Sequence, residues 1–168
     1  RVSVSAYAAS QEPSKLYMTA GDSFTLNDLL YSLMLPSHND TAVAIAEHVS
    51  GSTSAFAKKM NEKAKQLGCT STHFVTPNGL DAGLNHYTTA RDLAKIAQYA
   101  WKNATFRKIV GTSAWRFSSR QGLSYSVATT NALLRTMKGV TGMKTGFTNK
   151  AGYCFVCVVK AKSGKQYI

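Results

Sequence analysis

Apolar residues recur at helical spacing between about residues 25 and 110, which predicts a helical region in this part of the chain. The clearest stretch is 26–34, where the apolar residues fall three and four positions apart. Thr25 precedes this stretch and Asp28 follows three positions later, a variant of the capping box that marks a helix start. Pro36 cannot continue a helix, so we expect the helix to end there.

The same periodicity predicts three more helices. The first begins at residue 39 or 40 and ends at Gly51, the second spans 54–67, and the third is capped by Thr89 and runs to about residue 100. Residues 72–89 are rich in turn formers, which indicates an ordered loop that serves function or packing. A serine at position 37 therefore lies on a turn between two helices.

Alternation of apolar and polar residues predicts strands, mainly after residue 113. In chain order we expect a strand at 2–9, strands at 115–119 and 123–127 joined by a Gln121-Gly122 turn, a helical turn at 131–137, and a hairpin of 144–147 and 152–162 joined by 148–151. Helices followed by strands indicate an α+β fold in which helices cover an antiparallel sheet. The helical part takes about 25–110 and the sheet part about 113–168.

Composition favours a single folded domain over residues 1–168, since 44% of the residues are hydrophobic and only 3 are proline. The 20 basic and 8 acidic residues give a net charge of +12, which favours anionic surroundings such as nucleic acid, a membrane surface or a charged cell-wall polymer. The basic residues are scattered, and no zinc-finger spacing or phosphate-binding loop accompanies them. A nucleic-acid binder would therefore rest on charge alone, and we expect no nucleic-acid partner.

The cysteines and histidines do not predict a disulfide scaffold or a metal site. Cys69, Cys154 and Cys157 cannot all pair with one another, and the last two lie in the apolar run 153–159, where we expect buried thiols of a core strand. The four histidines lack metal-ligand spacing, so we expect no metal and no cofactor. The sequence has no run of 18 apolar residues, and residues 1–10 lack the apolar core of a signal peptide.

Two short motifs carry acyl-transfer chemistry: Ser37-His38-Asn39 on the predicted turn, and Lys144-Thr145-Gly146 at the start of a predicted strand. The set to which they belong also contains S-x-x-K, which supplies the nucleophile. No lysine of this chain has a serine three positions before it. The chain thus holds two walls of an active site without its nucleophile.

Each motif residue has a chemical use in such a site. Lys144 supplies positive charge for a substrate carboxylate or for deprotonating a serine hydroxyl, and Gly146 lets a substrate backbone approach the strand edge. Ser37 can shuttle a proton, and the Asn39 amide can orient a peptide carbonyl. The alternative is structural, with Ser37 as a helix cap and Asn39 as a turn residue. Either motif by itself is a weak signal; their order and placement strengthen the functional interpretation.

With these residues in view, the chain resembles the serine-type D-alanyl-D-alanine carboxypeptidases, which are low-molecular-mass penicillin-binding proteins. The resemblance covers nearly the whole chain and includes, beside the two motifs, the segments 35–42, 72–81, 86–94, 144–148 and 151–153. It implies a β-lactamase/transpeptidase-like fold, incomplete at both ends, whose nucleophile helix lies upstream of Arg1. A last strand and helix would follow the end of the chain. His38 replaces the small residue common at that position.

The resemblance also implies roles for the motif residues. Ser37 and Asn39 would shuttle the proton and orient the substrate. Lys144 and Thr145 would bind its terminal carboxylate, and the strand after Thr145 would hold its backbone and help to form the oxyanion hole. The candidate site is therefore Ser37, Asn39 and Lys144 as catalytic residues, with Thr145, Gly146, Phe147 and Thr148 binding substrate.

These roles imply an enzyme that trims peptidoglycan stem peptides ending in D-Ala-D-Ala and reacts with β-lactams. It would lie outside the cell, at the outer face of the cytoplasmic membrane, and this chain alone would be inactive. The alternative is a non-catalytic module that binds peptidoglycan or β-lactams. We expect the open strand edge left by the missing flanks to favour self-association or a second chain. We also expect Ser37 and Lys144 within about 3 Å, or about twice that through one water.

Overall fold

The computed structural model describes residues 1–80, 83 and 85–168. Its helices are α1 (Ala6–Ala9), α2 (Leu26–Met34), α3 (Asn39–Ser50), α4 (Thr53–Gln66), α5 (Ala90–Trp101), α6 (Ala104–Val110) and α7 (Leu133–Thr136). Its strands are β1 (Val2–Ser3), β2 (Ser23–Phe24), β3 (Ala114–Ser118), β4 (Ser124–Ala128), β5 (Val140–Thr148), β6 (Gly152–Lys160) and β7 (Gln166–Tyr167). Asp81, part of the segment 72–81 used above, lies outside the described residues.

Local capping residues set the helix boundaries that the sequence predicts. The Thr25 hydroxyl accepts a hydrogen bond from the Asp28 amide at 3.1 Å and donates one to its carboxylate at 2.6 Å, so the capping box is confirmed. Thr89 caps α5 in the same way, through the Asp92 amide. Gly51 closes α3 with a φ of +78°, a conformation that glycine adopts without strain. Pro36 follows the end of α2, and Ser37 lies on the turn to α3.

Several elements differ from the sequence predictions, among them the short strand β2, which was not predicted. The strand expected at 2–9 is wrong beyond Ser3, because Ser5 caps α1 by accepting a hydrogen bond from the Ala8 amide at 2.9 Å. Helix α6, which begins after its cap Asn103, was not predicted. Strand β7 was not predicted either, since its pairing with Val159 and Lys160 is not visible in local periodicity.

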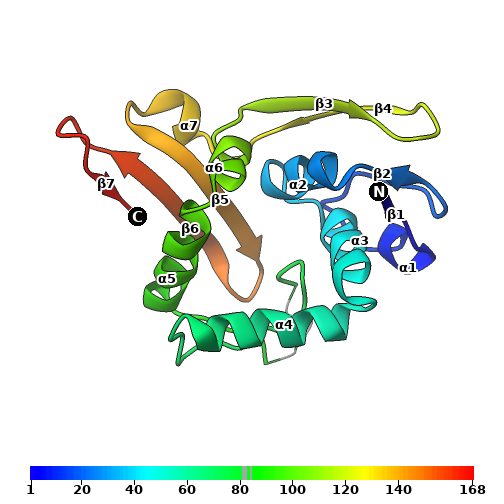
Figure 1. Ribbon diagram of the computed structural model, residues 1–168, viewed down its shortest axis with the longest axis horizontal. Helices are drawn as coiled ribbons and strands as arrows, with labels where there is room; N and C mark the ends of the chain where they lie inside the picture. The colour runs from blue at the N-terminus through cyan, green and yellow to red at the C-terminus, as the bar shows by residue number, and fades with distance from the viewer. Residues whose placement is uncertain (81–82, 84) are drawn as a thin grey trace.

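The helices and strands pack around two apolar clusters. In Figure 1, α2 and α3, which carry much of the larger cluster, lie to the right of α5 and β6, which contribute to the smaller one. In the larger cluster, α2 and α3 pack against β1, β2 and the hairpin β3–β4, with Phe24, Leu29 and Tyr31 at its centre. In the smaller cluster, Ala97 of α5 and Val110 of α6 meet Val158 of β6. Burial of these side chains supplies the main driving force for holding α5 and α6 against the sheet.

The strands form three antiparallel sheets, ordered β1-β2, β3-β4 and β5-β6-β7. The α+β class is confirmed, with the strands after residue 113 divided between the hairpin β3–β4 and the sheet β5-β6-β7. In that sheet β5 is an edge strand whose only partner among the described strands is β6. Within residues 1–80, 83 and 85–168, no helix combines the length and apolar character needed to cross a lipid bilayer.

The loop between α4 and α5 is held at its base by a few described residues. His73 and Tyr87 pair through two backbone hydrogen bonds of 2.8 and 2.9 Å. The buried Asp92 carboxylate accepts hydrogen bonds from the Ser71 amide and the Thr72 hydroxyl. The Ser71 bond is the main cause that lowers the pKa of Asp92. The predicted order of this loop is therefore confirmed at its base.

The prediction of buried thiols in β6 is wrong. Cys154 is exposed and Cys157 is half-buried, whereas Cys69 is buried. Helices α5 and α6 cover β6 around Val156 and Val158, but the hairpin end of the strand extends beyond that cover, and Tyr153 is 93% exposed there. An apolar run thus predicted the strand correctly, while the tertiary packing decided how much of it is buried.

Candidate functional site

The turn that carries Ser37 is fixed from both sides. Ser37 has a φ of +69°, a left-handed conformation that is uncommon for residues other than glycine. Before it, the Leu35 carbonyl accepts hydrogen bonds from the amide and the hydroxyl of Thr130 at 3.1 and 3.2 Å. After it, Nδ1 of His38 lies 2.9 Å from the hydroxyl of the buried Ser32, and burial lowers the pKa of His38.

Asn39 begins α3 and is 7% exposed. Its amide Nδ2 donates to the Glu12 carbonyl at 2.9 Å, and its backbone amide donates to the Ser14 carbonyl at 2.8 Å. In this structure Asn39 therefore anchors the loop 12–18 to the first turn of α3. Nδ2 carries two hydrogens, so the second can still serve a substrate carbonyl.

Lys144 is positioned by an irregular stretch of β5. The pairing with β6 shifts register between Val140 and Gly142, and Met143 has a φ of +107°. Such a bulge redirects the following side chain. The Lys144 ammonium donates to the Thr145 carbonyl at 2.6 Å, and burial lowers the pKa of Lys144 from 10.5 to about 8. At neutral pH the amine is mostly protonated, yet it loses its proton far more readily than a surface lysine does.

Thr130 links the two motif segments. Its hydroxyl lies 2.5 Å from the Thr145 hydroxyl and 3.2 Å from the Leu35 carbonyl. Leu35 lies two positions before Ser37, and Thr145 directly follows Lys144. Segments that are about a hundred residues apart in the sequence are thus held together through one side chain.

The remaining candidate residues lie along β5 toward the hairpin. Gly146 pairs with Cys154, and a side-chain carbon at Gly146 would meet only ordinary contacts at 3.7 Å, so packing does not require glycine there. Phe147 is 57% exposed, and its ring centroid lies 4.9 Å from that of Tyr153. The Thr148 hydroxyl accepts a hydrogen bond from the Ala151 amide at 3.0 Å and shapes the turn.

The structure thus joins Leu35, two positions before Ser37, to Thr145 of the Lys144 strand through Thr130. It places Gly146 on the edge strand and engages Asn39 with the loop 12–18. Thr130 was missed because it belongs to no motif, and its two partners are distant in sequence. The predicted separation between the Ser37 hydroxyl and the Lys144 ammonium stays a prediction.

Two hollows lie away from the motifs. One, of about 240 Å³, lies between α1, α3 and the segment 75–80, and the other, of about 470 Å³, lies beside α5 and α6. Neither is lined by Ser37, Lys144 or Thr145. Among the described residues, no three His, Cys, Asp or Glu side chains gather as a metal ion would require.

Comparison with known proteins places this geometry in a family. A family model described as D-alanyl-D-alanine carboxypeptidase matches residues 1–167. The chain belongs to this family. It is 36% identical over 160 residues to the D-alanyl-D-alanine carboxypeptidase DacF of Bacillus subtilis. This match covers 95% of the present chain and 41% of DacF. It is 40% identical over 173 residues to a D-alanyl-D-alanine carboxypeptidase of a Streptomyces species. This second match covers 96% of the present chain and 59% of that relative.

Solved structures of carboxypeptidase-family proteins share the fold. The Streptomyces K15 DD-transpeptidase superposes with a TM-score of 0.88 at 37% identity, over 98% of this chain and 68% of that one. The D-alanyl-D-alanine carboxypeptidase from Mycobacterium tuberculosis superposes with a TM-score of 0.90 at 35% identity, over 98% of this chain and 62% of that one. The transpeptidase-like fold that the resemblance implies is confirmed. The chain spans about two fifths to three fifths of the length of the curated relatives above.

Proposed function

We propose that this chain forms part of a serine-type D-alanyl-D-alanine carboxypeptidase, which acts on peptidoglycan stem peptides through an acyl-enzyme. The observation that carries the proposal is the Thr130 link, since it joins the Ser37 turn and the Lys144 strand in the described structure. Two motifs with complementary acid-base and anion-binding groups, carried on segments that Thr130 joins, support acyl transfer as the chemistry of this site.

The proposed roles follow from the local environments. Lys144 binds the terminal carboxylate of the substrate or takes a proton from Ser37, for which a pKa of about 8 suits it. Thr145 presents its hydroxyl to the same carboxylate. The backbone from Gly146 to Thr148, on an edge strand, pairs with the substrate backbone. Asn39 orients the substrate carbonyl with its second amide hydrogen.

The substrate class also sets the proposed location and ligands. Peptidoglycan lies outside the cytoplasmic membrane, so we place the protein at the cell envelope, where its net charge of +12 suits an anionic wall polymer. β-Lactams, as acylating analogues of D-Ala-D-Ala, are expected ligands. Because no S-x-x-K occurs in the sequence, this chain alone is expected to bind such ligands without acylation.

A binding experiment tests the proposal on the chain itself. Diacetyl-L-Lys-D-Ala-D-Ala should bind, as measured by NMR chemical-shift titration, and its diastereomer ending in L-Ala-L-Ala should bind far more weakly. Lys144→Ala should reduce affinity by about tenfold or more, the scale of losing a charged contact, while the exposed Lys63→Ala should not. Equal affinity for both diastereomers would reject the carboxypeptidase proposal.

A non-catalytic module that binds peptidoglycan or β-lactams is the second candidate, since the binding groups Lys144 and Thr145 would serve it equally well. Labelling with a fluorescent penicillin separates the two. A longer protein that contains this chain and an upstream S-x-x-K should acquire the label at one serine if the enzyme proposal is right. A module that only binds should lose the label on denaturation.

We also propose that the chain self-associates or pairs with a second chain. Strand β7 covers β6 only at Val159 and Lys160, and Phe155 is 45% exposed on the rest of that strand. An open edge beside apolar side chains favours strand addition. Sedimentation should show a concentration-dependent dimer, and Phe155→Lys should shift it toward monomer. A monodisperse monomer at all concentrations would contradict this proposal.

A further inference from the structure

Backbone strain concentrates around the candidate site. Among the described residues, the non-glycine residues with positive φ are Tyr17 (+62°), Ser37 (+69°) and Met143 (+107°). Ser37 belongs to the first motif, and Met143 directly precedes Lys144 of the second. Strained conformations of this kind persist only where surrounding contacts hold them, and they gather at functional sites. Tyr17 is the one of the three to which neither motif gives a role.

The loop around Tyr17 is clamped from beneath. The fully buried Asp40 carboxylate accepts hydrogen bonds from the amides of Leu16 and Met18 at 2.9 and 3.3 Å. Leu16 and Met18 are buried, whereas Tyr17 between them is 69% exposed. The clamp therefore holds an aromatic ring out in solvent in a strained conformation. Core packing does not explain this arrangement, because burial of the ring would be the favourable outcome.

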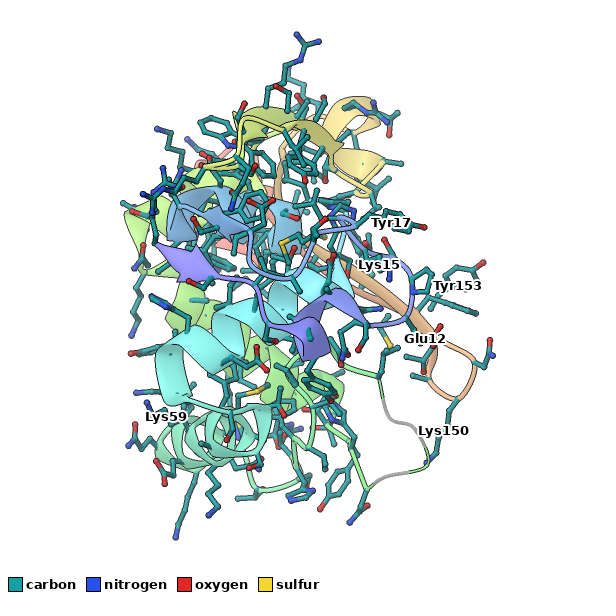
Figure 2. All side chains as sticks on the ribbon, turned by 90° about the vertical axis from the view of Figure 1, so that its right-hand side faces the viewer. Glu12, Lys15, Tyr17, Lys59, Lys150 and Tyr153 are labelled. Atoms are coloured by element: carbon teal, nitrogen blue, oxygen red, sulfur yellow. The ribbon has the colours of Figure 1, made fainter. Side chains whose placement is uncertain are left out.

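The same loop contacts the first motif. Asn39 binds the carbonyls of Glu12 and Ser14, so the loop lies against the turn of α3 that directly follows Ser37 and His38. Figure 2 shows Lys15, Tyr17 and Tyr153 on one side of the molecule, so the loop and the β5–β6 hairpin border the same face. The loop thus lies beside the turn of the first motif, on the side of the molecule toward which the β5–β6 hairpin extends.

Lys15 gives the exposed ring a charged neighbour. Its ammonium lies 5.3 Å from the centroid of the Tyr17 ring and donates to the Ala9 carbonyl at 3.2 Å. An ammonium has three donor hydrogens, so two remain for a ligand. A flat apolar ring beside a cation suits a ligand that combines aliphatic surface with a carboxylate.

We propose that Lys15 and Tyr17 form a subsite for the part of the stem peptide that lies upstream of its terminal tripeptide, which consists of one residue followed by D-Ala-D-Ala. The ring of Tyr17 packs on an aliphatic portion of the peptide, and Lys15 pairs with a free peptide carboxylate. This inference rests on the proposed function and adds a residue pair that determines peptide preference. Glu12 lies on the same side of the molecule, and its negative charge counts against an acidic peptide.

Three peptides test the subsite by NMR titration of the 168-residue chain. They are diacetyl-L-Lys-D-Ala-D-Ala, an extended stem peptide with a free carboxylate upstream of the same tripeptide, and that extended peptide with the carboxylate amidated. The free-acid peptide should bind about tenfold more tightly than the tripeptide, the scale of one aromatic contact plus one exposed ion pair. The amidated peptide should fall between them.

Two variants and their matched controls test whether Lys15 and Tyr17 cause the tighter binding of the extended peptides. Tyr17→Gly should remove the preference for the extended peptides, leave tripeptide affinity unchanged, and keep or raise the urea midpoint, since glycine adopts positive φ freely. Lys15→Gln should abolish only the difference between the acid and the amide. Lys63 and Tyr99 form a similar pair at 5.1 Å on α4 and α5, so Lys63→Gln and Tyr99→Ala should change no affinity.

The outcomes separate this inference from the proposed function. If the tripeptide binds but the extended peptides bind no more tightly, the subsite is rejected and the proposed function stands. The subsite is also rejected if Tyr17→Gly weakens all three peptides equally or lowers the urea midpoint, because Tyr17 would then be structural. If no peptide binds the unaltered chain, the proposed function fails and the subsite fails with it.

Discussion

The hydroxyl of Thr130 lies 2.5 Å from the hydroxyl of Thr145 while its other partner is the carbonyl of Leu35, 95 positions earlier in the chain. One small side chain thus joins the segment before Ser37 to the strand that carries Lys144. The two segments are joined at the point where substrate chemistry is proposed. We therefore infer that Thr130 is a positioning residue.

Thr130→Val should weaken binding of diacetyl-L-Lys-D-Ala-D-Ala by about tenfold, because valine keeps the shape but leaves Thr145 and Leu35 without the hydroxyl. Thr130→Ser, which keeps that hydroxyl, should bind as the unaltered chain does. NMR titration measures both, and urea unfolding checks that the Val variant is folded. Equal affinity of the two variants would show that the link has no part in binding.

Replacing two glycines of β5 with alanine should have different effects: Gly142→Ala should lower stability, and Gly146→Ala should lower peptide affinity. Gly142 has a φ of +126°, and a side-chain carbon there would lie 2.2 Å from the Val110 carbonyl oxygen, so Gly142→Ala should destabilise the chain by about 3 kcal/mol or more. Gly146 meets only contacts of 3.7 Å, so Gly146→Ala should fold normally but lose peptide affinity. Urea unfolding and peptide titration together check the pair. A normal unfolding midpoint for Gly142→Ala would contradict the packing of α6 on β5.

Anion binding should weaken as the pH rises above 8. Burial lowers the pKa of Lys144 to about 8, so the ammonium that attracts the peptide carboxylate loses its proton above that pH. Tripeptide affinity should fall by about tenfold in total between pH 7 and 10, the same scale as the loss expected for Lys144→Ala. A Lys144→Met variant should bind weakly with a flat profile. If the affinity of the unaltered chain does not change between pH 7 and 10, the charge of Lys144 does not contribute to binding.

The same pKa shift affects stability, with a fixed sign. The folded chain disfavours the charged amine, so between the folded pKa of about 8 and the ordinary 10.5 the unfolded chain binds more protons. Stability attributable to Lys144 is therefore lowest below pH 8 and rises as the pH increases toward 10.5. Relative to Lys144→Met, the unaltered chain should therefore gain unfolding free energy between pH 8 and 10.5, as measured by urea unfolding.

Asp40→Asn should destabilise the chain by about 2–3 kcal/mol, because the buried carboxylate accepts hydrogen bonds from the amides of Leu16, Met18 and Thr41. The side-chain NH2 group of an asparagine would face at least one of these three backbone N–H groups, and that N–H group would lose its acceptor. Glu62→Gln, an exposed change of the same chemistry, should have almost no effect. If both variants unfold at the same urea concentration, Asp40 does not hold the loop 12–18.

The helices could be predicted where their signals are local. Thr25 and Thr89 cap their helices by bonding amides three positions later, and Gly51 ends α3 within its own turn. Such contacts depend on neighbours in sequence, so the sequence shows them directly. The short β2 and the edge strand β7 depend on pairing with distant segments, and periodicity did not predict them.

The sequence by itself determined which chemical groups are present: a serine and an amide on one turn, an amine, a hydroxyl and a glycine on one strand, and a +12 charge around them. Only the tertiary structure decided where these groups lie, how far they are buried and how readily Lys144 loses its proton. Packing of α6 against β5 and the bulge before Met143 position Lys144, and burial lowers its pKa. Thr130 and Asp40 act through partners far along the chain. The reason is physical, since burial, desolvation and long-range hydrogen bonds arise only when distant segments share the same space.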